Sequence, residues 1–432
     1  MTVLLDDREP GFAAAFAALV EARREEAADV RDVVAAIIAD VRRDGDRALL
    51  DHTSRFDRLD LSAEGIRIGP DRIAAARARC DAAALAALEF AAARIRAFHE
   101  RQLPEDMAWV DAAGVRLGLR WRPVDAVGLY VPGGTAAYPS SVLMNALPAK
   151  VAGVGRIVMV VPTPDGVTNP LVLAAAEVAG VDEIYAVGGA QAVAALAYGT
   201  ATIAPVDKIV GPGNAYVAEA KRQVFGRVGI DMIAGPSEVV VVAQAVVDPD
   251  WIAADLLAQA EHDARAQAIL ITDDAAFGRQ VADAVAAQLA RLERGAIAAA
   301  SWRDEGAVLV VGRIEDARPL IDALAPEHLE LIGPGAEALA PAIRHAGAIF
   351  LGPLTPEAIG DYVGGPNHVL PTSRTARFAS GLAVHDFLKR TTILGCDREG
   401  FARLGPAAAR LARAEGLEAH ARSVERRLEA LP

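Results

Sequence analysis

The sequence predicts an α/β protein with two mostly parallel sheets. From about residue 128, short apolar runs typical of buried strands alternate with helical segments, and a second alternating block begins at Ser237. Strands that alternate with helices form parallel sheets covered by helices on both faces. The length of 432 residues also favours two or more domains, since a domain usually has roughly 100–200 residues.

The regions outside these two blocks are expected to be mostly helical. Apolar residues recur at helical spacing in 12–26 and 30–52, with charged residues on the opposite face. Residues 115–133 alternate and are rich in β-branched and aromatic residues, which predicts strands. After about residue 380 the chain is expected to return to helix and to end in a charged segment.

Capping residues and apolar runs define the elements within the two blocks. Asn169 and Pro170 predict the start of a helix and Gly180 predicts its end. Asp248 and Pro249 predict another start, and a further helix is expected near 275–293. The predicted strands of the two blocks are 156–162, 182–187, 207–210, 237–244, 268–272, 307–312 and 347–352.

The charge balance excludes partners that need a basic surface. The chain has 44 Lys+Arg against 57 Asp+Glu, a net charge of −13, so we expect no binding of nucleic acid or of an anionic membrane. A hydrophobic content of 53% with 23% charged residues supports a sizeable core rather than disorder. The two cysteines, Cys80 and Cys396, exclude a disulfide framework or a cysteine zinc finger and fit a reducing cytoplasm.

Two stretches without charge, 126–149 and 184–206, are long enough to suggest membrane spans. Both contain proline and glycine residues that would break a spanning helix, so we expect strand–loop–helix units instead. The first residues turn acidic at Asp6 and Asp7, where a signal peptide would need a basic and then an apolar segment. We therefore expect a cytoplasmic protein without a membrane span.

Three predicted strand-to-helix turns contain glycine clusters, at 131–139, 188–191 and 211–214. Glycine lets a ligand approach the backbone closely, and the following helix aims free N–H groups at an anion. Ligands in open parallel sheets bind beyond the carboxyl ends of the strands, where these turns are expected. No complete G-x-G-x-x-G is present, so tight turns alone would also explain each cluster. The turns bring side chains that can stack on or donate to a ligand: Tyr130, Gln191 and Asn214.

Polar side chains interrupt two apolar segments of the second block. Gln259 and His262 are three residues apart on one predicted helix, so they share a face. This spacing fits two metal ligands, or only a polar surface. Glu327 and His328 follow Pro326 and precede a strand, which places an acid beside an imidazole at a strand mouth. Such a pair can supply general acid and base groups, although loop polarity gives the same pattern.

Further candidates lie towards the end of the chain. Asp361 and His368 flank the turn at 364–366, and Glu415 and His420 lie in the C-terminal segment. Taken singly, these residues fit the polar surface of a helix. Because the chain lacks a usable cysteine pair, a zinc site would need nitrogen and oxygen ligands. One set that offers such ligands is Gln259, His262, Asp361 and His420.

Nine segments that include these candidate residues resemble the histidinol dehydrogenase family, and they occur in the same order as in the family. The N-terminal 100 residues share only its general helical character. In the penultimate matching segment His385 stands where many members carry tyrosine. The matching segments are 130–154, 186–200, 208–224, 229–243, 255–263, 325–331, 360–372, 376–390 and 415–420.

The resemblance implies two incomplete Rossmann-like domains with helical N- and C-terminal extensions, in a homodimer with shared active sites. It implies an N-terminal helical arm at 1–25 and a first α/β domain, with the zinc and catalytic residues, at 26–127 plus 237–380. The second α/β domain, on the NAD side, would be 128–236. The helical extension at 381–432 would reach the partner subunit.

The activity implied by the resemblance is the oxidation of L-histidinol through L-histidinal to L-histidine, with two NAD and one zinc per subunit. His328 would take the hydroxyl proton and Glu327 would activate water for the second step. Zinc would be held by Gln259, His262, Asp361 and His420. The substrate would contact Ser237, Gln259, His262, His328, Asp361, His368, Glu415 and His420. NAD would contact Tyr130, Gln191 and Asn214.

Three other functions stay open. A paralogous zinc- and NAD-dependent dehydrogenase could act on another polar alcohol, such as a sulfonated diol, although Glu415 suits the ammonium group of histidinol. A zinc hydrolase built on Gln259, His262 and Asp361 would not need the glycine turns. A regulatory protein that only binds metal or nucleotide would not need the pair at residues 327 and 328.

Overall fold

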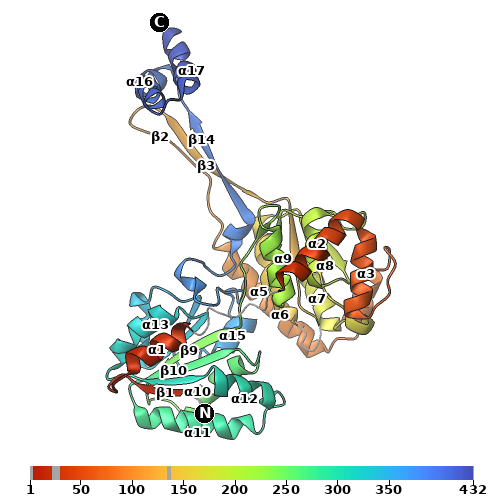
Figure 1. The fold of residues 1–432 in the computed structure, drawn as a ribbon, viewed down its shortest axis with the longest axis vertical. Helices are drawn as coiled ribbons and strands as arrows, with labels where there is room; N and C mark the ends of the chain where they lie inside the picture. The colour runs from red at the N-terminus through yellow and green to blue at the C-terminus, as the bar shows by residue number, and fades with distance from the viewer. Residues whose placement is uncertain (1–2, 22–29, 134–137, 432) are drawn as a thin grey trace.

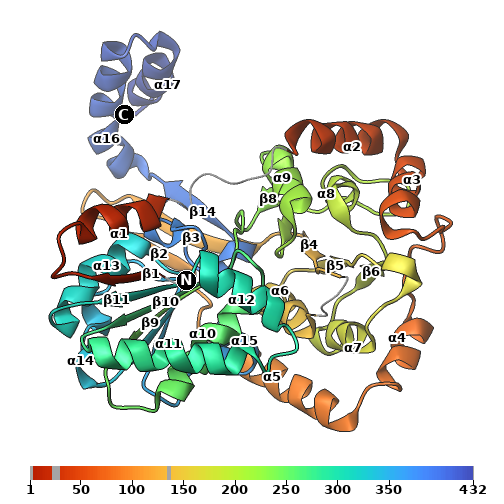
Figure 2. The same ribbon diagram turned by 60° about the horizontal axis from the view of Figure 1, so that its bottom comes forward.

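The computed structural model describes residues 3–21, 30–133 and 138–431, which form two α/β units and a projecting arm (Figure 1). Each unit is a parallel sheet with helices on both faces, so the predicted fold class is confirmed. Figure 2 shows the helices that flank both sheets. Of the predicted segments, 22–26 and the part of the first glycine turn at 134–137 lie outside the described residues.

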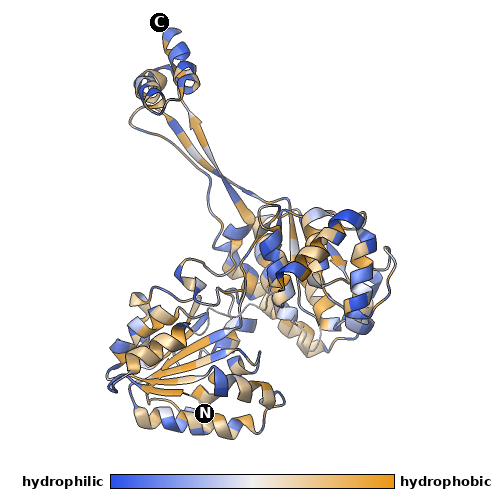
Figure 3. Ribbon diagram, viewed as in Figure 1, coloured by the Kyte–Doolittle hydropathy of each residue, from blue (hydrophilic) through white to orange (hydrophobic). Residues whose placement is uncertain are grey.

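The first sheet has six parallel strands. Its central strand β9 is buried at all six positions, as expected for a strand covered on both faces. Figure 3 shows these strands in hydrophobic colours. In sheet order the strands are β1 (Val3–Asp6), β11 (Ala307–Val310), β10 (Gln267–Thr272), β9 (Glu238–Ala243), β12 (His328–Ile332) and β13 (Ala348–Leu351).

Helices cover both faces of this sheet because alternate strand residues point to opposite sides. On one face Val239 and Val241 pack against α10 (Pro249–Ala260), α11 (Ala275–Leu289) and α12 (Gly295–Asp304). On the other face Val240 and Val242 pack against three further helices. These are α1 (Phe12–Glu21), α13 (Ala317–Leu324) and α14 (Pro334–Glu337).

The second sheet has five parallel strands, in the order β6 (Glu183–Tyr185), β5 (Arg156–Val160), β4 (Ala126–Tyr130), β7 (Lys208–Val210) and β8 (Gly229–Ile230). One face packs against α4 (Pro70–Arg77), α5 (Ala82–Glu100), α6 (Pro139–Ala152) and α7 (Pro170–Ala179). The other face packs against α2 (Arg31–Asp44), α3 (Asp46–Asp57), α8 (Gly189–Tyr198) and α9 (Ala215–Val224).

The N-terminal region differs from the prediction in two respects. Residues 3–6 form strand β1, which pairs with β11, instead of helix. The helices from α2 to α5 pack on the second sheet, whereas 26–127 had been grouped with 237–380. Their apolar faces predict burial, but helical spacing does not identify the sheet that buries them.

The arm consists of a three-stranded antiparallel sheet and two helices. The strands are β14 (Leu388–Gly395), β3 (Arg116–Pro123) and β2 (Met107–Val110), and the helices are α16 (Arg398–Ala414) and α17 (Glu418–Glu429). The expectation that the chain is helical after residue 380 is therefore wrong for β14. This strand pairs with β3, more than 260 residues earlier, and such a distant partner leaves no local signal.

The uncharged stretches have the predicted strand–loop–helix form. One contains β4 and α6, and the other contains β6 and α8. No helix within the described ranges is long and apolar enough to cross a membrane. The remaining short elements are α15 (Glu357–Tyr362), η2 (Pro164–Gly166), η3 (Ile314–Asp316), η4 (Ala340–Ala342), η5 (Thr375–Arg377) and η6 (Val384–Phe387).

Candidate active site

A buried group of acidic, amide and imidazole side chains lies at the amino end of two neighbouring strands. β9 and β12 pair in parallel, with His328 opposite Val239. Helices α10 and α15 bring further polar side chains to the same place. Each of α10, α15 and β12 contributes two residues on one face, because they are four apart on a helix or two apart on a strand. The pairs are Asp255 and Gln259 on α10, Glu357 and Asp361 on α15, and His328 and Glu330 on β12.

His328 is held as a neutral imidazole with one free nitrogen. Its Nδ1 lies 3.0 Å from the carbonyl oxygen of Glu238, which can only accept, so Nδ1 carries the hydrogen. Nε2 therefore carries a lone pair. It is buried without a hydrogen-bond partner among the described residues and lies 3.8 Å from Asp361 Oδ1. Burial lowers the pKa of His328 to about 4, against the raising effect of Asp361. The geometry of Nε2 is that of a general base.

Glu327 is fixed next to this imidazole. Its Oε2 accepts a hydrogen bond of 2.9 Å from the backbone N–H of Glu238 and lies 3.8 Å from His328 Nδ1. The predicted acid and imidazole pair therefore sits at the mouth of β12, as expected from Pro326 and the following strand. Both side chains are almost completely buried.

The site holds more carboxyl groups than cations. Burial raises the pKa of Glu330 well above its ordinary value, and the neighbouring Asp255 adds to this. Burial also raises the pKa of Glu357, with Asp361 as the next cause. In the part of the chain that the structure describes, no lysine or arginine pairs with Glu357 or Asp361. A bound cation would relieve this repulsion.

A metal ion fits the donor atoms of the site. Within the described ranges, one group presents ligand atoms within 4.8 Å of one another: His328, Glu357 and Asp361. This group shares only Asp361 with the predicted ligands. Gln259 lies against it, with its amide nitrogen 3.1 Å from Glu357 Oε1 in the orientation that hydrogen bonding favours. The other atom of this amide is an oxygen, a type of donor that suits a metal ion.

His368 connects the site to the second sheet. Its Nδ1 lies 3.0 Å from the backbone carbonyl of Asp361, and its Nε2 lies 3.3 Å from Ser141 Oγ on α6. Burial lowers the pKa of His368. The Arg94 guanidinium of α5 donates to the carbonyls of Val363 and Gly364. The loop after α15 is therefore fixed between the two units.

Of the other predicted site residues, two lie beside elements of the first sheet and two lie on the arm. His262 is exposed just after α10, close enough to lower the pKa of His328 and His368 by its charge. Ser237 directly precedes β9, and its carbonyl accepts from the Gln267 N–H. Glu415, in the turn after α16, and His420, on α17, are exposed. These helices form the tip of the arm (Figure 1), so the structure does not bring the two residues to the site of their own chain.

The glycine turns lie at the carboxyl ends of β4, β6 and β7, as predicted. Gly211 packs so closely on Tyr130 that a Cβ would lie 2.1 Å from its carbonyl oxygen. Tyr130 Oη accepts from the Gly189 N–H, and the buried Oε1 of Gln191 has no partner among the described residues. Asn214 caps α9 through its side-chain oxygen. The turns thus have packing roles and also leave polar groups for a ligand.

Comparison with known proteins identifies the family. The family model described as histidinol dehydrogenase matches residues 20–428. A histidinol dehydrogenase of Rhodospirillum rubrum is 66% identical, with 99% of each chain covered, and one of Ruegeria pomeroyi is 64% identical, with 100% of each covered. The chain belongs to the histidinol dehydrogenase family. A crystal structure of histidinol dehydrogenase from Elizabethkingia anophelis has a TM-score of 0.95 and 36% identity, and covers 100% of this chain and 98% of that chain.

The sequence pattern and the resemblance to the histidinol dehydrogenase family led to the pair at residues 327 and 328 but not to the carboxyl groups around it, which are buried or half-buried. Asp255, Glu330 and Glu357 were missed. Each lies at helical or strand spacing from a predicted residue, and Glu330 is a charged residue between two buried leucines of β12. A charged residue between two apolar ones could have predicted a functional role for Glu330, because a carboxyl group is rarely buried without one.

Proposed function

We propose that the chain catalyses the oxidation of L-histidinol through L-histidinal to L-histidine, with two NAD and one zinc ion per subunit. The observation that carries the proposal is the buried neutral His328, whose lone-pair nitrogen faces Asp361 in a site with surplus carboxyl groups. Membership of the histidinol dehydrogenase family supports the choice of substrate.

Zinc would be held by Gln259, His262, Asp361 and, in a dimer, His420 of the partner subunit. The position of Gln259 beside the buried carboxyl groups, and the absence of a lysine or arginine paired with Asp361 among the described residues, support this set. We do not include His328 among the zinc ligands, because the lone pair of its Nε2 is then available to the substrate. When bound, zinc would fix and polarise the substrate.

The protein's own groups account for the proton transfers. His328 Nε2 would accept the hydroxyl proton of the alcohol, and its Nδ1–H bond to Glu238 would keep the imidazole oriented. Glu327 would remove a proton from the water that adds to the aldehyde. The bond from the Glu238 N–H to Glu327 Oε2 would hold that carboxylate in place.

NAD would lie along the carboxyl end of the second sheet, near Tyr130, Gln191 and Asn214, and would supply the acceptor for hydride when bound. The buried Oε1 of Gln191, without a partner among the described residues, supports a polar ligand here. Ser141, on the helix after the first glycine turn, already reaches His368. A ligand at this edge would therefore lie next to the site on the first sheet.

The active sites would be shared between the subunits of a homodimer. The arm extends away from both α/β units (Figure 1), and it exposes large apolar side chains that a second chain would cover. These include Met107, Trp109, Val110, Ile393 and Leu394. A partner's arm would bring Glu415 to the substrate ammonium group, while Ser237 and His368 would contact the substrate from the same chain.

The test of the proposal is the stoichiometry of the reaction. NADH formed per L-histidinol consumed is measured with and without a metal chelator. We expect a ratio of about two and loss of turnover on chelation, recovered by added zinc. A ratio of about one would indicate an enzyme that stops at the aldehyde, and turnover without NAD would indicate a hydrolase.

A further inference from the structure

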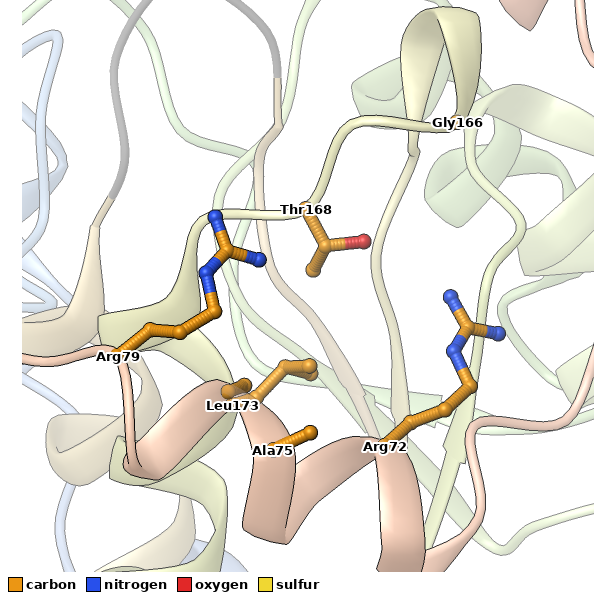
Figure 4. A pocket seen from close by; sticks show the side chains of 7 residues that line it. Arg72, Ala75, Arg79, Gly166, Thr168 and Leu173 are labelled. Carbon is orange, nitrogen blue, oxygen red and sulfur yellow. The ribbon is translucent and has the colours of Figure 1, made fainter.

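A pocket with a largely apolar lining and two arginines lies beside α4, away from the site described above. It has a volume of about 240 Å³ and is lined by Arg72, Arg79 and Thr168 together with apolar side chains that include Ala75 and Leu173. Figure 4 shows both guanidinium groups and the threonine side chain on the same side of the helix. Arg72 lies on α4, whereas Arg79 lies in the turn that follows the end of this helix at Arg77.

These two arginines differ from their neighbours in having no acidic partner among the described residues. Arg77, on the same helix, pairs with Glu89 at 2.7 Å and with Glu177 at 3.4 Å. Arg58, near the adjoining loop, pairs with Asp165. Both arginines are exposed, and two guanidinium groups without acidic partners beside one cavity favour an anion between them. The pocket therefore has the charge of an anion site.

Thr168 adds a donor that is otherwise unused. Its Oγ1 is buried and has no hydrogen-bond partner among the described residues. The adjacent helix α7 does not explain this, because Asn169 already caps it by accepting from Leu171 N–H. A ligand oxygen in the pocket would satisfy the hydroxyl, since a buried polar group without a partner is destabilising.

We propose that this pocket binds a small phosphate monoester. Two arginine forks and a hydroxyl suit a dianion with three terminal oxygens better than a carboxylate, which one arginine satisfies. The apolar floor at Ala75 and Leu173 suits the uncharged body of an ester. A cavity of about 240 Å³ is small for a dinucleotide, since pockets for drug-sized ligands have roughly 300–1,000 Å³.

The pocket is separate from the proposed NAD site. Leu173 belongs to the core on one face of the second sheet, whereas Tyr130 belongs to the core on the opposite face. The pocket and the proposed NAD site both lie near the carboxyl end of the sheet, because Thr168 is in the loop after β5 and Tyr130 is the last residue of β4. The sheet itself thus lies between the two places, and a phosphate of NAD bound near Tyr130 would not occupy this pocket.

The test is calorimetric titration of the full-length, zinc-loaded protein with inorganic phosphate and with phenyl phosphate. We expect one saturable site per chain and tighter binding of phenyl phosphate. Arg72→Gln, Arg79→Gln and Thr168→Val should each weaken binding by about tenfold or more, the scale of one charge-assisted hydrogen bond. Arg72→Lys should weaken binding as well, because lysine lacks the fork. Arg47→Gln, an exposed arginine paired with Asp44, is the control and should have no effect.

Three outcomes would overturn the proposal. One is the absence of saturable binding up to about 10 mM of either probe, the range of weak specific sites. Another is unchanged binding in the Arg72→Gln/Arg79→Gln double variant, whose folding is checked by circular dichroism. The third is displacement of the probe by saturating NAD, which would make the pocket part of the nucleotide site.

Discussion

The Nδ1 atom of His328 lies 3.0 Å from the carbonyl oxygen of Glu238, where the neighbouring strands β12 and β9 of the first sheet begin. This one contact determines the tautomer, because a carbonyl oxygen can only accept. It directs the lone pair of Nε2 towards Asp361. A backbone group on a buried strand thus orients the imidazole in the way that the proposed base would need before substrate binds.

Replacing His328 should separate proton transfer from metal binding. In His328→Gln we expect kcat to fall by about 10²–10⁴-fold, the usual contribution of a general base. Zinc content measured by elemental analysis should stay at one per chain. Gln259→Leu is the matched comparison and should lose zinc and activity together. Loss of zinc in His328→Gln would instead make His328 a ligand, as its position beside Glu357 and Asp361 allows.

The same histidine should make the apoprotein less stable in acid. Burial lowers the pKa of His328 from 6.5 to about 4. The unfolded chain therefore takes up a proton below about pH 6.5, while the folded chain does not until about pH 4. The free energy of unfolding should decrease as pH falls through this window. Urea unfolding of the chelated protein at several pH values should show a smaller decrease in the free energy of unfolding for His328→Gln than for the wild type. The control His420→Gln, at an exposed residue, should show the same decrease as the wild type.

Glu327 should matter mainly for the second oxidation. Its carboxylate accepts a hydrogen bond from the Glu238 N–H, and the proposed activation of water would need it as a base. Glu327→Gln keeps the size and the acceptor oxygen but removes the base, so oxidation of histidinal should fall about 10²–10⁴-fold while oxidation of histidinol falls much less. Single-turnover absorbance of NADH with each substrate measures the two steps. Equal losses in both would contradict the assigned role.

The repetitive part of the fold could be predicted from local sequence, and the long-range pairing could not. Buried strands such as β9 and capped helices such as the one starting after Asp248 carry their own signals. β1 and β14 are short or exposed and exist because distant strands, β11 and β3, offer them hydrogen bonds. A pattern within four or eight residues contains no information about such a partner.

The candidate site divides in the same way. The pair at residues 327 and 328 was recognisable because the two residues are adjacent and precede a strand. The buried Glu357 was not, because its role depends on packing against His328 and Gln259 from other elements. Spacing of four residues from Asp361 is equally common on a helix surface. Only the tertiary arrangement distinguishes a buried carboxyl from an exposed one.

A buried ion pair should support the third glycine turn. Lys221 pairs with Asp231, donates to the Gly211 carbonyl at 2.9 Å, and both side chains are almost fully buried. Lys221→Met would leave Asp231 charged and buried, at a cost of about 3–5 kcal/mol in the free energy of unfolding. Lys221→Met/Asp231→Asn should recover most of that stability. Chemical denaturation compares the two, with exposed Arg222→Gln as the control; equal losses in both variants would mean that burial of the charge is not the cause.

Shared active sites predict complementation between two inactive chains. His420→Ala and Asp361→Ala should each lack activity, because one removes a ligand from the arm and the other a ligand from the buried site. In a mixed dimer, one of the two sites would combine an intact arm with an intact buried site, so up to about half of the wild-type activity per dimer should return, if the two sites act independently. Differently tagged chains are refolded together, and the doubly tagged dimer is isolated and assayed. A mixture of the Asp361→Ala chain with a chain that carries both substitutions is the control, since it leaves no intact site. Full inactivity of verified mixed dimers would mean that the arm's residues do not complete the partner's site.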